Sequence, residues 1–123
     1  MFKIYNINSL LIKIFEALLY ICAPFSNKIE KGIIGRKNSF KKLNLCFKKG
    51  DRIIHIHCAS HGEYLLSKRL IENLKKKFEN HKFLLSFISP SGYENVKSDL
   101  FDCIIYLPLA SNKNCIKFYN IIK

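Results

Sequence analysis

The sequence predicts an α/β fold built on a parallel sheet. Three short runs rich in β-branched and aromatic residues alternate with three segments of helical periodicity: the expected strands are 52–58, 82–88 and 103–107, and the expected helices are 64–78, 91–98 and 112–122. Strands that alternate with helices are typical of a parallel sheet, whose crossover connections are helical. With 123 residues, 49% of them apolar, the chain is long enough for one domain with a buried core.

The first strand and the helix after it are the most clearly marked elements. A turn at Gly50-Asp51 precedes the run RIIHIHC, and a short loop of small and polar residues, 59–62, follows it. The next segment places five apolar side chains on one helical face: Leu66, Leu70, Ile71, Leu74 and Phe78. Lysines 75–77 stand in its last turn, where positive charge interacts favourably with the helix dipole.

Two loops follow strands and mark the place to look for a ligand. The run KFLLSFI leads into the segment SPSG at 89–92, as RIIHIHC leads into ASHG at 59–62. Ligands of open α/β sheets bind at the carboxyl ends of the strands, and glycines and helix N-termini there allow a ligand to approach backbone N–H groups. The candidate substrate-binding residues are therefore Ser60, Gly62, Ser89, Ser91 and Gly92.

Residues 1–25 are interpreted as a membrane-anchor helix, expected to be helical over 4–23 and to end at Pro24. Polar residues at 6, 9, 13, 16 and 20 share one narrow stripe of the helical wheel, and apolar residues cover the rest. This pattern favours a helix that lies in the membrane interface over one that spans the bilayer. The expected membrane contacts are Leu11, Ile14, Phe15, Leu18 and Leu19. The alternative is a soluble helix packed on the domain that follows.

Positive charge is concentrated next to this segment. The net charge is +12, and only 3 of the 21 basic residues are arginine, the residue best suited to reading bases. Residues 26–50 are expected to be a basic linker that faces an anionic membrane surface, and residues 51–123 the globular domain. By the positive-inside rule this places the basic segment on the cytoplasmic side of a membrane. Because arginine is scarce, we expect no nucleic acid as partner.

The cysteines and histidines do not form a recognisable metal or disulfide motif. The 5 cysteines contain no CxxC pair, which favours reduced thiols that serve as small buried residues. His55 and His57 point to one side of the first strand and His61 follows nearby, but this set has no defined fourth ligand. We therefore predict no metal and no cofactor.

Five motifs together resemble one enzyme family. The segment HCASHGE at 57–63 resembles the HxxSxGE signature of bacterial 3-deoxy-D-manno-octulosonic acid (Kdo) transferases. Four further segments are similar to family elements in order and at compatible spacing: GRK at 35–37, LIENLK at 70–75, SFISPSGYE at 86–94 and YLPL at 106–109. His61 departs from the pattern, because the family usually has a small apolar residue there, and His55 stands where an aromatic residue is common.

The resemblance implies a fold and a reaction. Kdo transferases have the two-domain GT-B fold: the N-terminal domain holds a lipid A precursor at the membrane, and the C-terminal domain binds CMP-Kdo. Transfer proceeds with inversion and without a metal, and a glutamate that matches Glu63 is the general base. A carboxylate in that role removes the proton of a sugar hydroxyl, which is otherwise a poor nucleophile. The alternative is that Glu63 only stabilises a helix N-terminus.

The length of the chain leaves three functional hypotheses. The first is the acceptor-binding half of a Kdo transferase, which we expect to be inactive alone because binding of CMP-Kdo needs a C-terminal donor domain. The second is a non-catalytic, membrane-associated remnant of such an enzyme. The third is a basic nucleic-acid-binding module, which a steep salt dependence of binding would reveal.

Overall fold

The computed structural model describes the backbone of residues 2–22 and 25–123 and the side chains of residues 10–22 and 25–123. In chain order the described elements are α1 (Phe2–Cys22), α2 (Asn27–Cys46), β1 (Ile53–Cys58), α3 (His61–Lys77), β2 (Lys82–Phe87), α4 (Pro90–Asn95), β3 (Cys103–Tyr106) and α5 (Asn112–Ile122). The order of these elements from β1 onward is the one that the sequence predicts.

The three strands form one sheet in the order β1-β2-β3, and both pairs are parallel. Leu85, at the centre of β2, is paired with Ile56 on one side and Ile104 on the other. This confirms the prediction of an α/β fold with a three-stranded parallel sheet. The predicted element boundaries shift by up to three residues, at the start of α3 and at the end of α4. Helix α3 begins at His61 because the Ser60 side chain caps it.

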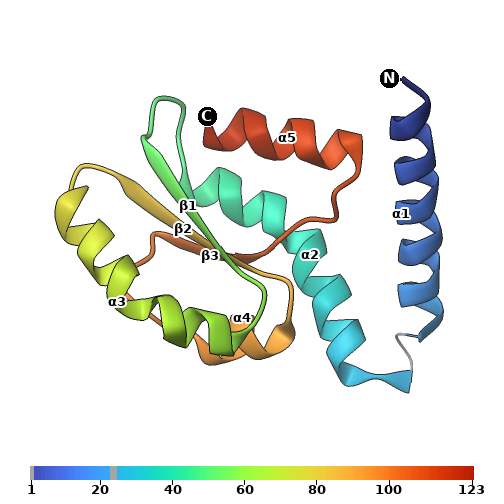
Figure 1. Ribbon diagram of the computed structural model, residues 1–123, viewed down its shortest axis with the longest axis horizontal. Helices are drawn as coiled ribbons and strands as arrows, with labels where there is room; N and C mark the ends of the chain where they lie inside the picture. The colour runs from blue at the N-terminus through green and yellow to red at the C-terminus, as the bar shows by residue number, and fades with distance from the viewer. Residues whose placement is uncertain (1, 23–24) are drawn as a thin grey trace.

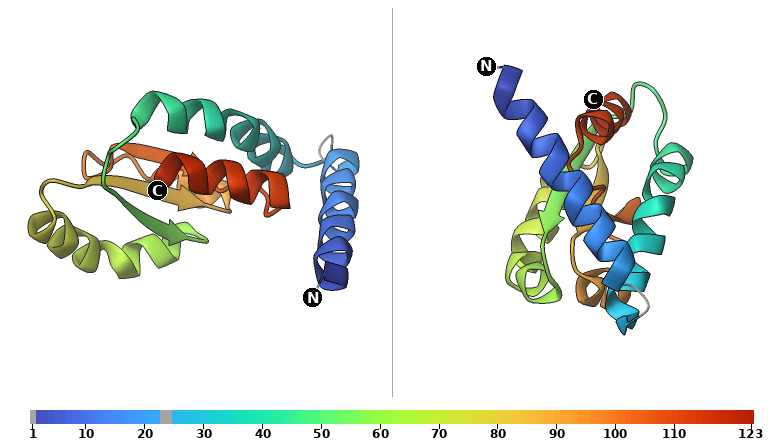
Figure 2. Two further views of the ribbon diagram at one scale, coloured as in Figure 1. Left: turned by 90° about the horizontal axis from the view of Figure 1, so that it is seen from above. Right: turned by 90° about the vertical axis from the view of Figure 1, so that its right-hand side faces the viewer.

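Helices cover both faces of the sheet, so the domain has three layers (Figures 1 and 2). On the face of α3 and α4, the core includes Tyr64, Ile71, Phe83, Leu85 and Phe87. On the face of α2 and α5, it includes Leu43, Phe47, Leu84 and Ile105, with Phe118, Ile121 and Ile122 of α5 packed against it. Successive residues of β2 thus alternate between the two cores, as the pleat of a strand requires.

The segment expected to be a basic linker contains a helix that belongs to the domain. Helix α2 packs along β3, where the Ser39 hydroxyl donates a hydrogen bond of 2.6 Å to the carbonyl of Tyr106. The buried residues of α2 are Gly32, Ser39 and Leu43. Because two of these three are small or polar, the contact leaves little hydrophobic periodicity in the sequence, and the helix was not predicted.

The predicted apolar face of α3 is partly wrong. The buried residues of this helix are Tyr64 and Ile71, whereas Leu66 is 89% exposed and Leu70 is 62% exposed. At about 100° per residue, Leu66 lies about 200° around the helix from Tyr64, so the two cannot contact the same sheet. The cysteine prediction also holds only in part: Cys58 and Cys103 are buried, but Cys22 and Cys115 are exposed.

Helix α1 stands beside α2 at one end of the domain (Figures 1 and 2). The predicted helix is observed up to Cys22; residue 23 and Pro24 lie outside the described residues. Leu11, Ile14, Phe15 and Leu18 are each about half exposed or more, while Leu19 is half-buried. Among residues 2–22 and 25–123, no helix is both long and apolar enough to cross a bilayer.

Candidate functional site

The two loops singled out in the sequence meet at the carboxyl edge of the sheet. The backbone N–H of Ser89, after β2, donates a hydrogen bond of 3.0 Å to the carbonyl of Ala59, after β1. Ser60 is the N-cap of α3 and Ser89 is the N-cap of α4, so both hydroxyls accept backbone N–H groups of their own helices. Parallel pairing of β1 with β2 brings these loops together, because it places their carboxyl ends side by side.

Glu63 lies in the first turn of α3 and is exposed to solvent. Its Oε2 accepts a 2.7 Å hydrogen bond from the backbone N–H of Ala59, and its own N–H donates to the Ser60 hydroxyl at 3.5 Å. This is close to a capping box, in which a serine and a glutamate three residues later each satisfy an N–H group of the helix end. The arrangement fixes the carboxylate beside the two loops.

The remaining candidate residues differ in their surroundings. Ser91 is exposed, and its hydroxyl lies 2.9 Å from that of Ser89. Gly62 is exposed, and a methyl group there would meet nothing closer than the Ser60 hydroxyl at 3.8 Å. Gly92 is buried, and a Cβ atom there would lie 2.1 Å from the Phe87 ring. Gly92 is therefore required by packing, whereas Ser91 and Gly62 are exposed and Ser89 is half-buried.

Two of the histidines share a hydrogen-bond partner. Nε2 of His55 lies 2.8 Å, and Nδ1 of His57 2.9 Å, from the hydroxyl of Ser86, which is itself completely buried. Burial, and to a lesser degree the nearby His57, lowers the pKa of His55 from its ordinary 6.5 to about 4. His55 is therefore neutral at physiological pH and acts as a structural partner for Ser86 on the α5 face of the sheet.

Arg36 is a residue whose place in the site could not be predicted. Its Nη2 donates a 2.9 Å hydrogen bond to the carbonyl of Ile88, directly before the Ser89 loop, and its guanidinium lies 5.7 Å from the centre of the Tyr106 ring. Its Nε is buried without a hydrogen-bond partner among the described residues. Burial lowers the pKa of this guanidinium, against the opposing effect of Tyr106.

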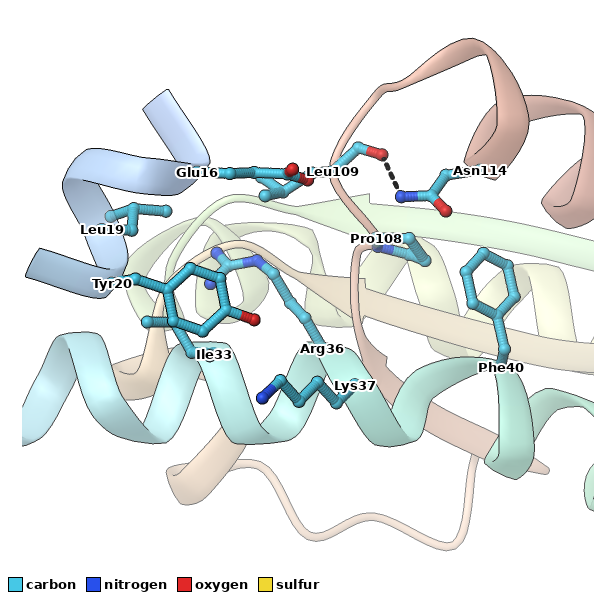
Figure 3. A pocket seen from close by; sticks show the side chains of 10 residues that line it. All are labelled: Glu16, Leu19, Tyr20, Ile33, Arg36, Lys37, Phe40, Pro108, Leu109 and Asn114. Atoms are coloured by element: carbon cyan, nitrogen blue, oxygen red, sulfur yellow. Dashed lines mark hydrogen bonds between the residues drawn. The ribbon is translucent and has the colours of Figure 1, made fainter. Parts of the chain in front are cut away.

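Two cavities open beside Arg36, between α1, α2 and the segment after β3. The larger has a volume of about 600 Å³ and also includes Ser89 in its lining. The smaller, of about 250 Å³, is shown in Figure 3, where Tyr20 of α1 and Lys37 of α2 lie in front of and below Arg36. Leu19, Pro108 and Leu109 line both. Glu63 is not in the lining of either cavity.

Comparison with known proteins assigns the chain to a family. Residues 33–123 match the family model described as 3-deoxy-D-manno-octulosonic-acid transferase (kdotransferase). The chain belongs to the Kdo transferase family. A 3-deoxy-D-manno-octulosonic acid transferase of Aquifex aeolicus is 33% identical over 89 residues, which are 71% of this chain and 24% of that protein. A bifunctional glycosyltransferase/methyltransferase of Fusobacterium nucleatum is 32% identical over 112 residues, 85% of this chain and 16% of its own length.

The chain thus spans about a quarter or less of the length of these relatives. No solved structure matches the chain. The Kdo transferase assignment agrees with the family suggested by the sequence motifs.

The segments that carry the Kdo transferase resemblance pack against one another in the fold. A Cβ atom at Gly35 of the GRK segment would lie 2.2 Å from the Tyr106 ring of the YLPL segment, so only glycine fits there without a shift. The Tyr93 ring of the SPSGYE segment is stacked 4.1 Å from that of Tyr106, and Lys42 of α2 donates to the Tyr93 hydroxyl at 2.6 Å. These contacts join α2, α4 and β3 at the edge that carries the candidate site.

Proposed function

We propose that this chain is the acceptor-binding half of a Kdo transferase, with the architecture of the N-terminal part of a GT-B enzyme. The observation that carries the proposal is the family match over 33–123, which includes the HCASHGE segment and the whole parallel sheet. In this function a lipid A precursor is the acceptor, and CMP-Kdo is the donor when a C-terminal donor-binding domain is supplied. The product belongs to lipopolysaccharide biosynthesis.

Glu63 is the proposed general base. One carboxylate oxygen is held by the N–H of Ala59, and the exposed position of the side chain leaves the other open to an acceptor. As the acceptor oxygen forms its bond to the anomeric carbon of Kdo, its proton passes to Glu63, and the bond from Kdo to the CMP phosphate breaks. Ser60 and Ser89, at the ends of the two joined loops, and Gly62 and Ser91, in the first turns of the helices that follow, supply hydroxyl and backbone groups for acceptor binding.

The membrane surface is the proposed location, on the cytoplasmic face of the inner membrane. Helix α1 leaves Leu11, Ile14 and Leu18 about half exposed on adjacent positions of one helical face, a pattern typical of an interfacial helix, and the half-exposed Phe15 lies at the edge of this face, where it also lines the larger cavity. Residues 1–50 add a net charge of +8, which attracts anionic lipid headgroups. An acceptor that lies in the bilayer would then meet the domain at the end where α1 packs.

A binding measurement tests this function without the donor. The full chain is titrated with a radiolabelled lipid A precursor in mixed micelles, and with a fully deacylated and dephosphorylated sugar backbone as control. We expect saturable binding of the precursor and none of the sugar backbone. Equal binding of both, or no binding of either, would contradict the proposed acceptor role.

A further inference from the structure

Arg36 combines a fixed position with unused hydrogen-bonding capacity. Its Nη2 bonds to the carbonyl of Ile88, but its Nε is buried without a partner among the described residues. An unpartnered donor in such a place is costly, and the cost is higher for a charged group. Gly32 provides the room, because a Cβ atom there would lie 2.7 Å from Nη1 of Arg36. The fold thus holds a cation at the wall of a cavity without neutralising it there.

The side chains that line the larger cavity indicate the chemistry of its occupant. It is lined mostly by apolar side chains: Phe15, Leu19, Ile29, Ile88, Leu107 and Leu109. The charged residues in its lining are Arg36 and Lys28, both positive, and no acidic residue of the described chain lines it. The acidic Glu16 lines only the smaller neighbouring cavity, and it makes no ion pair with Arg36 among the described residues. The volume of about 600 Å³ is that of a small-molecule site.

We propose that Arg36 is the anion-binding residue of this cavity, which takes a phosphorylated amphiphile with its phosphate at the guanidinium and its alkyl chain along the apolar wall. The proposal rests on the proposed function only in taking the natural occupant to be the acceptor. A guanidinium suits phosphate because it presents several N–H donors in one plane.

The position of Arg36 also connects the cavity to Glu63. Arg36 bonds to the carbonyl of Ile88; the N–H of the next residue, Ser89, bonds to the carbonyl of Ala59; and the N–H of Ala59 bonds to the carboxylate of Glu63. A phosphate bound at Arg36 is therefore connected to the proposed base by three successive hydrogen bonds, of which the middle one joins backbone groups and the outer two join a side chain to the backbone. Arg36 is a binding residue of the cavity and a positioning residue for the Ser89 loop.

Isothermal titration of the full chain with dodecyl phosphate, below its micelle concentration, tests the proposal. Dodecyl maltoside is the neutral amphiphile, and inorganic phosphate tests whether the anion alone suffices. We expect dodecyl phosphate to bind more tightly than both. Arg36→Met should weaken its binding by about tenfold or more, because a charge-assisted hydrogen bond and the charge are both lost. Lys68→Met, on the far side of the sheet, should leave binding unchanged.

Two results would overturn the proposal. The first is equal affinity of the parent chain and Arg36→Met for dodecyl phosphate; the second is an equal loss in Lys68→Met, which would indicate attraction to the net charge alone. If Arg36→Met fails to fold, as circular dichroism would show, Arg36→Lys replaces it. Lysine keeps the charge but lacks the planar guanidinium with its several N–H donors, and this variant should bind dodecyl phosphate several-fold more weakly. Binding of dodecyl phosphate that depends on Arg36, without binding of a lipid A precursor, would uphold this site and reject the proposed acceptor.

Discussion

Gly35→Ala tests whether the joint between α2 and β3 is as tight as the structure indicates. The added methyl group would lie 2.2 Å from Cδ2 and 2.3 Å from Cε2 of Tyr106, whereas ordinary contacts begin at 3.4 Å. The ring must therefore retreat by about 1 Å. It is 2% exposed and stacked on Tyr93 at 4.1 Å, so it cannot move without displacing its neighbours.

Two opposing contributions set the expected change in the free energy of unfolding. Overpacking of a filled core costs about 1–3 kcal/mol, and alanine in place of glycine inside a helix contributes about 1 kcal/mol of stability. Because the clash involves a rigid ring rather than a flexible chain end, we expect a net loss of about 1–2 kcal/mol in the free energy of unfolding. Urea unfolding followed by far-ultraviolet circular dichroism measures this.

Two comparisons make the test specific. Gly62→Ala, whose methyl group would meet only the Ser60 hydroxyl at 3.8 Å, should be neutral or stabilising by up to about 1 kcal/mol. Tyr106→Leu in the same chain as Gly35→Ala should remove most of the cost of the alanine, since the ring is gone. A Gly35→Ala protein as stable as the parent would refute the packing described for this joint.

Two further predictions concern pH and the membrane. Because the pKa of His55 falls from 6.5 to about 4 on folding, the unfolded chain takes up its proton first as the pH drops, and stability is lost from about pH 6.5 down to pH 4. His55→Gln should remove up to about 2 kcal/mol of the stability loss between pH 7.5 and 5, as measured by urea unfolding. An unchanged pH dependence of stability in this variant would count against a buried neutral histidine. Membrane binding is measured by flotation with vesicles of phosphatidylglycerol and phosphatidylcholine, where Leu18→Asp on α1 should weaken binding about tenfold or more. The control Leu66→Asp on α3, where the leucine is 89% exposed, should leave vesicle binding unchanged. Equal effects of the two variants would refute membrane contact through α1.

The sheet could be predicted because its signal is local. The runs RIIHIHC, KFLLSFI and CIIYL are short, rich in β-branched and aromatic residues and separated by helical segments, so their parallel pairing followed from the alternation. Helix α2 could not be assigned to the domain, because its contact with β3 uses Gly35 and Ser39, residues that hydrophobic periodicity does not register. The buried face of α3 was predicted wrongly because Leu66 and Leu70 fit the hydrophobic periodicity but are exposed in the structure.

Part of the candidate site could likewise be predicted from the sequence, and part could not. Ser60 was predicted from its loop after the first strand and Glu63 from the motif resemblance, and the structure places them in a capping arrangement at the carboxyl edge of β1. Arg36 stands out in the sequence only as part of a GRK segment. Its surroundings depend on Ile88 and Tyr106, which are far from it along the chain and reach it only through the folded sheet.

The rate of Kdo transfer by a Glu63→Gln variant tests the central claim most directly. The chain replaces the matched region of the Aquifex aeolicus relative, so that the relative supplies the rest of the enzyme, and transfer from CMP-Kdo to a lipid A precursor is measured. Glutamine can still accept the N–H of Ala59 and preserve the helix end, but it cannot take the acceptor's proton. We predict a loss of about 100- to 10,000-fold for Glu63→Gln and near-parental rates for the control Glu72→Gln on the same helix. A Glu63→Gln chimera that transfers Kdo at the parental rate would contradict the account and leave Glu63 as a helix cap alone.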